Sequence, residues 1–464
     1  MKRTLKILAL ILTFIVALPL ALAGCGDGRD YYEDEHGNRI AISKIKFLHI
    51  WPEHNAALTK IVNDFMAANP AIRVETQTTS YGDIQTYLNS QLLSGSLPDV
   101  FFYWSKQVKG YIDSDVLLDL SPYTDDWKNT YINNGEAWEW AHRNGGYYSA
   151  PFRVTGNIIV YNKSLFADCG LTAPADIVAF EDALKRVRNL SASNSFAPLA
   201  VTGVAGGTLV QLYTAFQNFV GLQQEGYLDP NYKTGRLETN DEILANEAKM
   251  LTKLRDWYRK YYFGYCDGKT ESTAIRNFVE GNAAMVLMNN NNLYLLDDIG
   301  DDFEVGFMSI PAPSDVDYTY IYSDFDGFSI AKNTRYKEAS VKFLKYLTGK
   351  AVQQSFADTE GSIMTLSDIV YKNADQQSMA VALKDAGDAR LAYTDAEFST
   401  GDYDNKNAES VLNFIMDKSA ASASKVVQDI YSNNVKAMRD AGLSPLAWTV
   451  APKTADLSWL DLRT

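Results

Sequence analysis

Strands and helices alternate along the first ordered part of the chain, and this alternation constrains the fold most strongly. Apolar side chains recur with helical spacing over 58–66, and Asn69–Pro70 ends that helix. The expected elements are strand 46–50, helix 58–66, strand 73–78, a helix over 84–92 that closes at Gly95, and strand 100–103. Strands joined by helical crossovers run parallel and have both faces covered, so the pattern predicts an α/β fold.

Length and composition indicate two lobes and a narrow set of partners. A chain of 464 residues is too long for one hydrophobic core, and three cysteines are too few for a disulfide framework. Cys169 and Cys266 are either free or joined in one bridge. The net charge of -14 argues against nucleic acid as a partner, because phosphates repel an acidic surface. The 28 Tyr, 21 Phe and 8 Trp could supply stacking surfaces for a ligand, although most rings are expected in the core.

The N-terminal segment has the features of an export signal. Basic residues at positions 2, 3 and 6 precede the apolar run Ile7–Ala23, and Gly24 and Cys25 follow it. A permanent membrane helix is the alternative, but Pro19 and the small residues before Cys25 favour cleavage. Leu22–Cys25 resembles the lipobox of bacterial lipoproteins. That resemblance implies that residues 1–24 are a signal peptide and that the Cys25 thiol is acylated, which anchors the chain to a lipid bilayer outside the cytoplasm.

The remaining segments predict a tether and a second lobe. Gly26–Ser43 has almost no aliphatic residue, so 25–44 is expected to be a flexible lipidated tether. Further on, the expected strands are 147–152, 157–161, 198–201, 283–288, 303–310 and 321–330, and the expected helices begin near 165, 180, 209, 242, 275 and 337. The chain changes lobe near the 157–161 strand, and the part after Gly349 is expected to be mostly helical.

Ligands of parallel α/β sheets bind beyond the carboxyl ends of the strands. Trp51 and Glu53 follow the first predicted strand, and Tyr103 and Trp104 end the third. The rings of Trp51, Tyr103 and Trp104 either stack on a sugar or pack in the core. Asp99 precedes its strand, lies at the opposite end of the sheet, and is expected to be structural.

Several other polar residues allow two interpretations. Asp324 and Asp326 project from one face of a strand, either as a carboxylate pair for glycoside hydrolysis or as hydrogen-bond acceptors. The four asparagines at 289–292 form either a turn or a ligand site. His49 and His54 are too weak a pattern to indicate a metal, and neither a metal nor a cofactor is expected.

The order of segments resembles a known family. The segments that carry the resemblance are 46–51, the helix ending at 69–70, 97–101, 117–120, 148–151, 161–166, 278–288 and 326–347. Together they are similar to extracellular solute-binding proteins of bacterial ABC sugar importers, the family that includes maltose-binding protein. The resemblance implies a two-lobed α/β periplasmic-binding-protein fold of type II, in which each lobe is a mostly parallel sheet flanked by helices and the ligand lies between lobes. On this basis we expect lobe 1 to comprise 45–155 and 304–347, and lobe 2 to comprise 156–303 and 348–464.

The resemblance also selects ligand-binding candidates. Trp51 and Glu53 match the loop after the first strand, and Tyr103 matches a stacking aromatic. Thr155 lies on the crossing segment at a position that is often acidic, with Arg153 beside it. The ligand-binding candidates from residue chemistry and from the resemblance together are Trp51, Glu53, Tyr103, Trp104, Arg153, Thr155, Asn290, Asn291, Asp324 and Asp326. Asn291 stands where many sugar binders carry Trp, so one stacking platform is replaced by an amide.

We therefore expect a lipid-anchored, monomeric substrate-binding protein on the extracytoplasmic face of the cell membrane. It would capture a carbohydrate and deliver it to an ABC permease, without catalysis. One alternative is a cell-surface glycosidase that uses Asp324 and Asp326. The others are a structural or adhesive lipoprotein and a binder of a non-sugar solute.

Overall fold

The computed structural model describes most of the chain from residue 30 onward. The described residues are 30–80, 83–104, 111–112, 114–123, 142–143, 145–190, 196–220, 241–261, 270–300, 302–315, 320–321, 323–372, 374–384, 390–391, 402–440 and 458–460. The predicted signal peptide, Cys25 and Cys266 lie outside these ranges. Cys169 is described and forms no disulfide.

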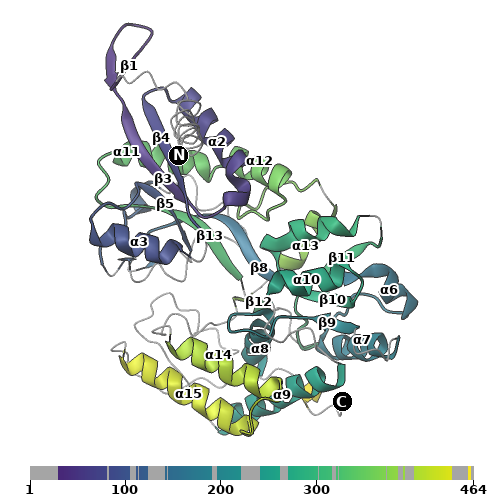
Figure 1. Cartoon of the computed structure of the whole chain (residues 1–464). Coiled ribbons are helices and arrows are strands. Elements are labelled where there is room, and N and C mark those ends of the chain that lie inside the picture. The colour runs from purple at the N-terminus through teal and green to yellow at the C-terminus, as the bar shows by residue number, and fades with distance from the viewer. Residues whose placement is uncertain are drawn as a thin grey trace, which may run out of the picture.

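One sheet runs through both lobes, in the strand order β4-β3-β5-β13-β8-β10-β9, with β11 paired to β8 as well (Figure 1). Its strands are β3 (Ser43–His49), β4 (Ile72–Thr78), β5 (Val100–Trp104), β8 (Ala150–Asn162), β9 (Ala197–Ala200), β10 (Ala283–Asn289), β11 (Val305–Met308) and β13 (Ser323–Ile330). Two-stranded pairs are β1 (Tyr31–Glu33) with β2 (Arg39–Ala41), β6 (His142–Arg143) with β7 (Gly146–Tyr147), and β12 (Tyr320–Ile321) with β14 (Arg390–Leu391).

The predicted βαβαβ unit is confirmed in the first lobe. Its helices are α2 (Asn55–Ala68) and α3 (Ile84–Leu93), joined in this lobe by α11 (Lys337–Leu347) and α12 (Lys350–Glu360). Strand β3 pairs in parallel with both β4 and β5, as the helical crossovers require. Aromatic rings pack the helices against the sheet. The ring centroid of Phe343 in α11 lies 5.2 Å from that of Phe47 in β3 and 5.0 Å from that of Phe65 in α2. Asp99 is structural, because its carboxylate accepts hydrogen bonds from Lys46 N and Thr334 Oγ1.

On one side of its sheet, the second lobe has a core separate from that of the first lobe. Its helices are α6 (Lys163–Asp168), α7 (Ile177–Leu190), α8 (Thr208–Val220), α9 (Asp241–Tyr261), α10 (Glu271–Val279), α13 (Ala374–Lys384), α14 (Asp402–Ile415) and α15 (Ala423–Asp440). The second lobe also has the short 3-10 turns η7 (Asn290–Ile299) and η9 (Ser458–Leu460). The 3-10 turns η1 (Pro52–His54) and η3 (Ser121–Tyr123) belong to the first lobe. Trp257 of α9 is fully buried and packs edge-on against Phe180 and Phe216, which ties α7 and α8 to α9. Strands β9 and β10 pair in parallel.

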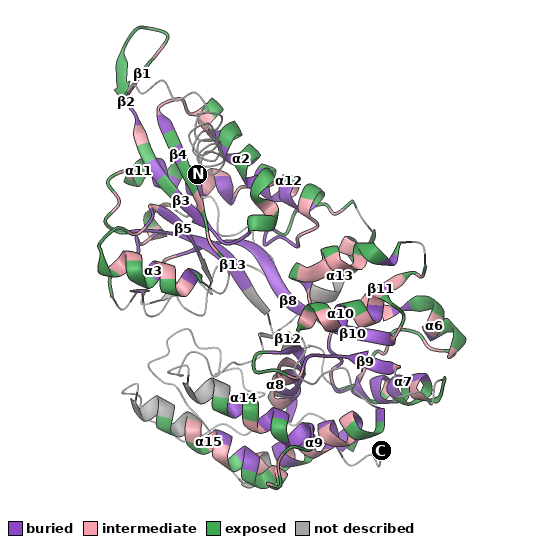
Figure 2. Ribbon diagram, viewed as in Figure 1, coloured by how far each residue is buried: buried purple, intermediate pink, exposed green. Residues whose placement is uncertain are grey.

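The strand β8 joins the two lobes, and this part of the prediction was wrong in detail. The segments 147–152 and 157–161 were expected to be separate, but β8 continues without a break from Ala150 to Asn162. Its first half pairs antiparallel with β13, and its second half pairs antiparallel with β10 and β11. Strand β3 with β4 and β5, and β9 with β10, are parallel pairs, while β8 pairs antiparallel with all its partner strands and β13 pairs antiparallel with β5. Almost every residue of β8 is buried (Figure 2).

Two predicted lobe boundaries also differ from the observed packing. Helix α12 was expected in lobe 2, yet it packs against α2 and α11, and its Phe356 ring contacts Phe152 and Trp51. Strand β11 was expected in lobe 1, yet Val305 to Met308 pair with Asn162 to Ile159 of β8. The chain thus returns to the second lobe before β13 and remains with the first lobe through α12.

Residues from position 30 in the predicted tether are ordered. Tyr31–Glu33 and Arg39–Ala41 form a hairpin, with the Arg39 guanidinium 4.5 Å from the centroid of the Tyr31 ring. The turn is stabilised by the Asp34 carboxylate, which accepts hydrogen bonds from two backbone N–H groups, and by Gly37, whose φ of 77° suits glycine. Within the described ranges, no helix combines the length and the apolar character needed to cross a membrane.

Candidate functional site

Polar side chains line the strands at the point where β8 and β13 pass from one lobe to the other. Asp326 pairs with Arg153, and Asp324 pairs with Thr155. Because directly paired residues and residues two apart share a face of a sheet, these four residues belong to one face. Thr155 is buried, and the side chain of Asp324 lies outside the described part of the structure. The predicted candidates Arg153, Thr155, Asp324 and Asp326 are thus brought together, and we call these four residues the polar row.

Arg153 and Asp326 form a buried ion pair. Arg153 Nε donates to Asp326 Oδ2 at 2.6 Å, and the two side chains are 5% and 7% exposed. The guanidinium carbon also lies 4.3 Å from the centroid of the Trp51 ring. An ion pair this well shielded fixes the geometry of the crossing strands, because separating it would leave a buried charge without a partner. Asp326 is committed to Arg153, which counts against Asp324 and Asp326 as a glycosidase pair.

Trp51 lies in the core, contrary to the expectation that its ring is available for stacking on a ligand. The residue is 1% exposed. Its ring packs against those of Phe102, Phe152 and Phe328, with ring centroids 5.3 to 5.7 Å apart. The loop after β3 folds back over the sheet instead of projecting from it. Pro52 begins the short η1 turn that makes this reversal possible.

The carboxyl end of β5 also reaches the crossing strands. Trp104 pairs with Asp326, and Tyr103 pairs with Gly327. These two residues are described by their backbone, which places them at the same edge as the ion pair. The expectation that ligand-binding residues follow strand ends therefore identified Tyr103 and Trp104, which lie beside the polar row on β8 and β13.

Two functional candidates were missed from the sequence. Asn157 of β8 is 1% exposed, and its Nδ2 donates to Gln211 Oε1 of α8 at 2.6 Å. Gln211 Nε2 in turn donates to Gly206 O at 3.0 Å. Asn157 follows Thr155 by two residues and so extends the polar row into the second lobe. The signal in the sequence was the spacing of Arg153, Thr155 and Asn157 within an otherwise apolar strand.

Asn290 braces the crossing strand. Its Oδ1 accepts from Gly156 N and its Nδ2 donates to Val154 O, both at 2.9 Å. The last backbone pair of β10 is Asn289 with Asn157, so the Asn290 amide continues the ladder where the strand ends. Both hydrogen-bonding ends of this buried side chain are thereby engaged with the backbone, which makes Asn290 a structural residue in this state.

The rest of the asparagine run forms a turn. Asn289 Oδ1 accepts from Asn291 N at 3.0 Å, and Asn291 is exposed. Glu271 Oε1 accepts from Asn289 N at 2.6 Å and from Asn292 Nδ2 at 2.8 Å. Burial raises the pKa of the Glu271 carboxyl, and these two hydrogen bonds oppose the shift. The turn therefore holds Asn290 and Asn291 in fixed positions.

The two histidines near this region have structural partners. Burial, followed by the charge of His54, lowers the pKa of His49 to about 4. His49 accepts from Trp51 N at 3.2 Å and contacts Thr78 Oγ1 at 3.1 Å. His54 Nδ1 lies 2.6 Å from Glu360 Oε2. Among the described residues, no group of three or more His, Cys, Asp or Glu side chains could hold a metal ion.

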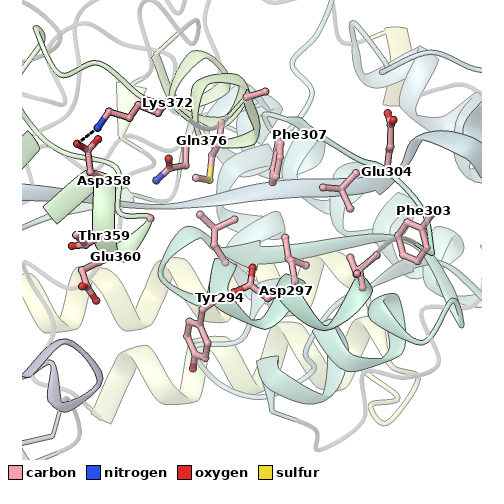
Figure 3. Close-up of a pocket in the computed structure, with 18 of the residues that line it drawn as sticks. Tyr294, Asp297, Phe303, Glu304, Phe307, Asp358, Thr359, Glu360, Lys372 and Gln376 are labelled. Atoms are coloured by element: carbon pink, nitrogen blue, oxygen red, sulfur yellow. Dashed lines mark hydrogen bonds and ion pairs between the residues drawn. The ribbon is translucent and has the colours of Figure 1, made fainter. Parts of the chain in front are cut away.

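A pocket of about 1050 Å³ opens between the end of α12 and the second lobe (Figure 3). Of the predicted ligand-binding residues, Glu53 lines it. Its walls combine three aromatic rings with carboxylates that outnumber lysines, and Lys372 pairs with Asp358 at 2.6 Å. The principal lining residues are Glu53, Tyr294, Asp297, Phe303, Glu304, Phe307, Asp358, Glu360, Lys163, Lys372 and Gln376.

In the second lobe, the pocket and Asn157 lie on opposite faces of β8, because Phe307, which lines the pocket, pairs with Val160. Met379 of α13 lines the pocket and packs in the same core cluster as Ile158 and Val160. Ile159, whose side chain shares a face with Asn157, packs instead with α7, α8 and α9. In the second lobe, β8 therefore separates the buried side chain of Asn157 from the open, acidic pocket.

Residues 51–354 match the model of the family described as bacterial extracellular solute-binding protein. The multiple sugar-binding protein of Streptococcus mutans is 25% identical over 396 residues, covering 81% of this chain and 87% of the relative. The sugar-binding protein MalE of Xanthomonas citri superposes with a TM-score of 0.69 at 18% identity, covering 86% of this chain and 99% of that one. A Staphylococcus aureus solute-binding protein in complex with maltose gives 0.65 at 13% identity, covering 87% and 99%. The family match covers well over half of the chain, which therefore belongs to the bacterial extracellular solute-binding proteins.

Proposed function

We propose that this protein binds a carbohydrate against the polar row of β8 and β13 and delivers it to an ABC permease. The observation that carries this proposal is the row itself, where Arg153, Thr155 and Asn157 lie on one face of the strand that joins the lobes. Sugars need several hydrogen-bonding groups held in fixed positions, and the buried ion pair and amide pair provide such positions. The sugar-binding names of the relatives support the choice of ligand.

Closure of the lobes would complete the site. The chain crosses between lobes along β8 and β13, so these strands are the natural hinge. A ligand that contacts both lobes stabilises the closed state by the free energy of the contacts made in that state alone. The permease would then recognise the closed form. No step of this cycle requires catalysis, so we assign no enzymatic activity.

Other predicted residues keep their roles as proposals. Tyr103 and Trp104 would stack on a sugar face at the end of β5, and Asp324 would accept hydroxyl hydrogen bonds beside Thr155. Asn291 is exposed at the start of η7 and offers an amide to the ligand. A stacking ring contributes about 0.5 to 1.5 kcal/mol beyond its buried area, so loss of one ring should weaken binding measurably.

The N-terminal sequence supports a lipid anchor at Cys25 on the extracytoplasmic face. Because a tethered binder stays near its membrane partner, its effective concentration at the permease is raised. The hairpin at residues 31–41 lies within the predicted tether. Retention of the full-length protein in the membrane fraction, and its release by Cys25→Ser, would test the anchor.

The ligand proposal is tested by calorimetry and thermal unfolding of residues 30–464 with maltose, raffinose and N,N′-diacetylchitobiose. A sugar at 100 times its Kd should stabilise the protein by about 2.7 kcal/mol. Thr155→Val should weaken that sugar's binding while the free protein remains folded by circular dichroism. Hydrolysis of any of these sugars without a stable complex would favour a surface glycosidase and remove the transport proposal.

A further inference from the structure

Asn157 has one hydrogen-bonding end in use and one end unused. The residue lies on β8 just beyond the crossing point and is 1% exposed. Its Nδ2 donates to Gln211 Oε1, but its Oδ1 has no hydrogen-bond partner in the described structure. A buried amide oxygen without a donor destabilises a fold, so natural structures seldom retain one without a reason.

The orientation of the Asn157 amide follows from its neighbour. Gln211 Nε2 donates to the carbonyl oxygen of Gly206 at 3.0 Å, so the Gln211 oxygen faces Asn157. Flipping the Asn157 amide would place two oxygens 2.6 Å apart, and two acceptors repel each other. Gly206 therefore orients Gln211, Gln211 orients Asn157, and the unused group at Asn157 is an acceptor.

The position of Asn157 connects this acceptor to the polar row. Arg153, Thr155 and Asn157 alternate along β8 and share one face. Gln211 belongs to the first turn of α8, so this pair supplies the second-lobe end of the row, while Arg153 and Asp326 supply the other end. A ligand held against the row would meet one acceptor of fixed direction from the second lobe.

We propose that Asn157 Oδ1 accepts a hydrogen bond from the ligand and helps determine its specificity. The donor would be a sugar hydroxyl, or the N–H of an acetamido group. This inference rests on the proposed carbohydrate function. It adds that Asn157 recognises a hydrogen-bond donor at one position of the ligand. An analogue that lacks the donor leaves Asn157 Oδ1 unpaired and should bind about tenfold to a hundredfold more weakly.

The experiment combines protein variants with deoxy sugars. Of maltose, raffinose and N,N′-diacetylchitobiose, the sugar that binds best is titrated into wild type and Asn157→Leu by calorimetry, followed by its monodeoxy derivatives. We expect Asn157→Leu to lose about tenfold to a hundredfold in affinity. One deoxy derivative should lose as much on wild type and nothing further on Asn157→Leu. A general loss of structure would weaken all derivatives together and would not give this position-specific non-additivity.

A second variant and the remaining outcomes complete the test. Gln211→Leu removes the group that orients Asn157, and because Gln211 is partly exposed this variant should fold even where Asn157→Leu does not. We expect it to show the same non-additivity with the deoxy sugar, with a smaller loss of affinity. If wild type binds a sugar and both variants bind it equally well, the inference is wrong while the proposed function stands. If wild type binds no sugar in the panel, the proposed function fails and this inference fails with it.

Discussion

Removal of the Asp326 charge should destabilise the protein strongly. Asp326→Asn keeps the shape of the side chain but leaves the Arg153 guanidinium buried and unpaired. Both side chains are at least 93% shielded, and Nε lies 2.6 Å from Oδ2, so solvent can do little to compensate. Breaking such a pair typically costs about 3 to 5 kcal/mol. We expect a decrease of this size in the free energy of unfolding, measured by urea denaturation followed by circular dichroism.

A double-mutant cycle separates the pair from its surroundings. Arg153→Met removes the cation that faces the buried Asp326 carboxylate and also removes the cation from the Trp51 ring, so its own cost should be comparable. The double variant Arg153→Met with Asp326→Leu buries no charge and should cost much less than the sum of the two single changes. The coupling between the two positions should exceed about 2 kcal/mol.

A surface ion pair provides the matched control. Lys60 and Asp64 also lie 2.6 Å apart, but their side chains are 73% and 53% exposed. Asp64→Asn should change the free energy of unfolding by less than about 0.5 kcal/mol. If Asp326→Asn behaves like Asp64→Asn, or if the cycle is additive, then water reaches the crossing strands and the reasoning from burial is refuted.

Three further predictions concern the surroundings of the row. Asn290→Leu leaves a donor and an acceptor of β8 unpaired and should cost about 2 to 4 kcal/mol in urea unfolding, whereas Asn292→Ala should cost less than 1 kcal/mol. The pKa of His49 is about 4 in the folded protein, below its ordinary value of 6.5, so between these pH values the unfolded chain binds more protons than the folded protein. The free energy of unfolding should therefore fall by about 3 kcal/mol as pH drops from 6.5 towards 4, and His49→Gln should flatten this dependence. Gly306→Ala would place a Cβ 2.3 Å from the Tyr161 ring and should lower the melting temperature, with Tyr161→Leu restoring part of the loss.

Local periodicity predicted the elements well because it reports which face of each segment is buried. The spacing over 58–66 identified α2, whose buried residues include Leu58, Ile61, Val62 and Phe65. The same reasoning located β4, α3 and β5 to within a residue or two at each end. Each of these elements joins its neighbours through short connections, so sequence order and spatial order coincide there.

Local periodicity could not predict contacts between residues far apart in the sequence. Nothing local distinguishes α12 from a helix of the second lobe, and its assignment depends on Phe356 meeting Phe152, which is about two hundred residues away in sequence. Trp51 is a similar case. A tryptophan at the end of a strand fits a binding loop equally well, and three phenylalanines from distant strands and the Pro52 turn decide that it is buried.

The sequence did contain a signal for the polar row, although periodicity alone concealed it. Arg153, Thr155 and Asn157 alternate with Val154, Gly156 and Ile158, which is the pattern of a half-exposed strand with one face in water. In the folded protein both faces of β8 are buried at these positions, so the polar face meets protein instead of water. Burying polar groups is costly unless they are paired, and Arg153 is paired with Asp326. The Nδ2 group of Asn157 has a hydrogen-bond partner, but its Oδ1 is buried without one. A ligand that donates a hydrogen bond to Oδ1 would therefore relieve the unfavourable free energy of a buried, unpaired acceptor.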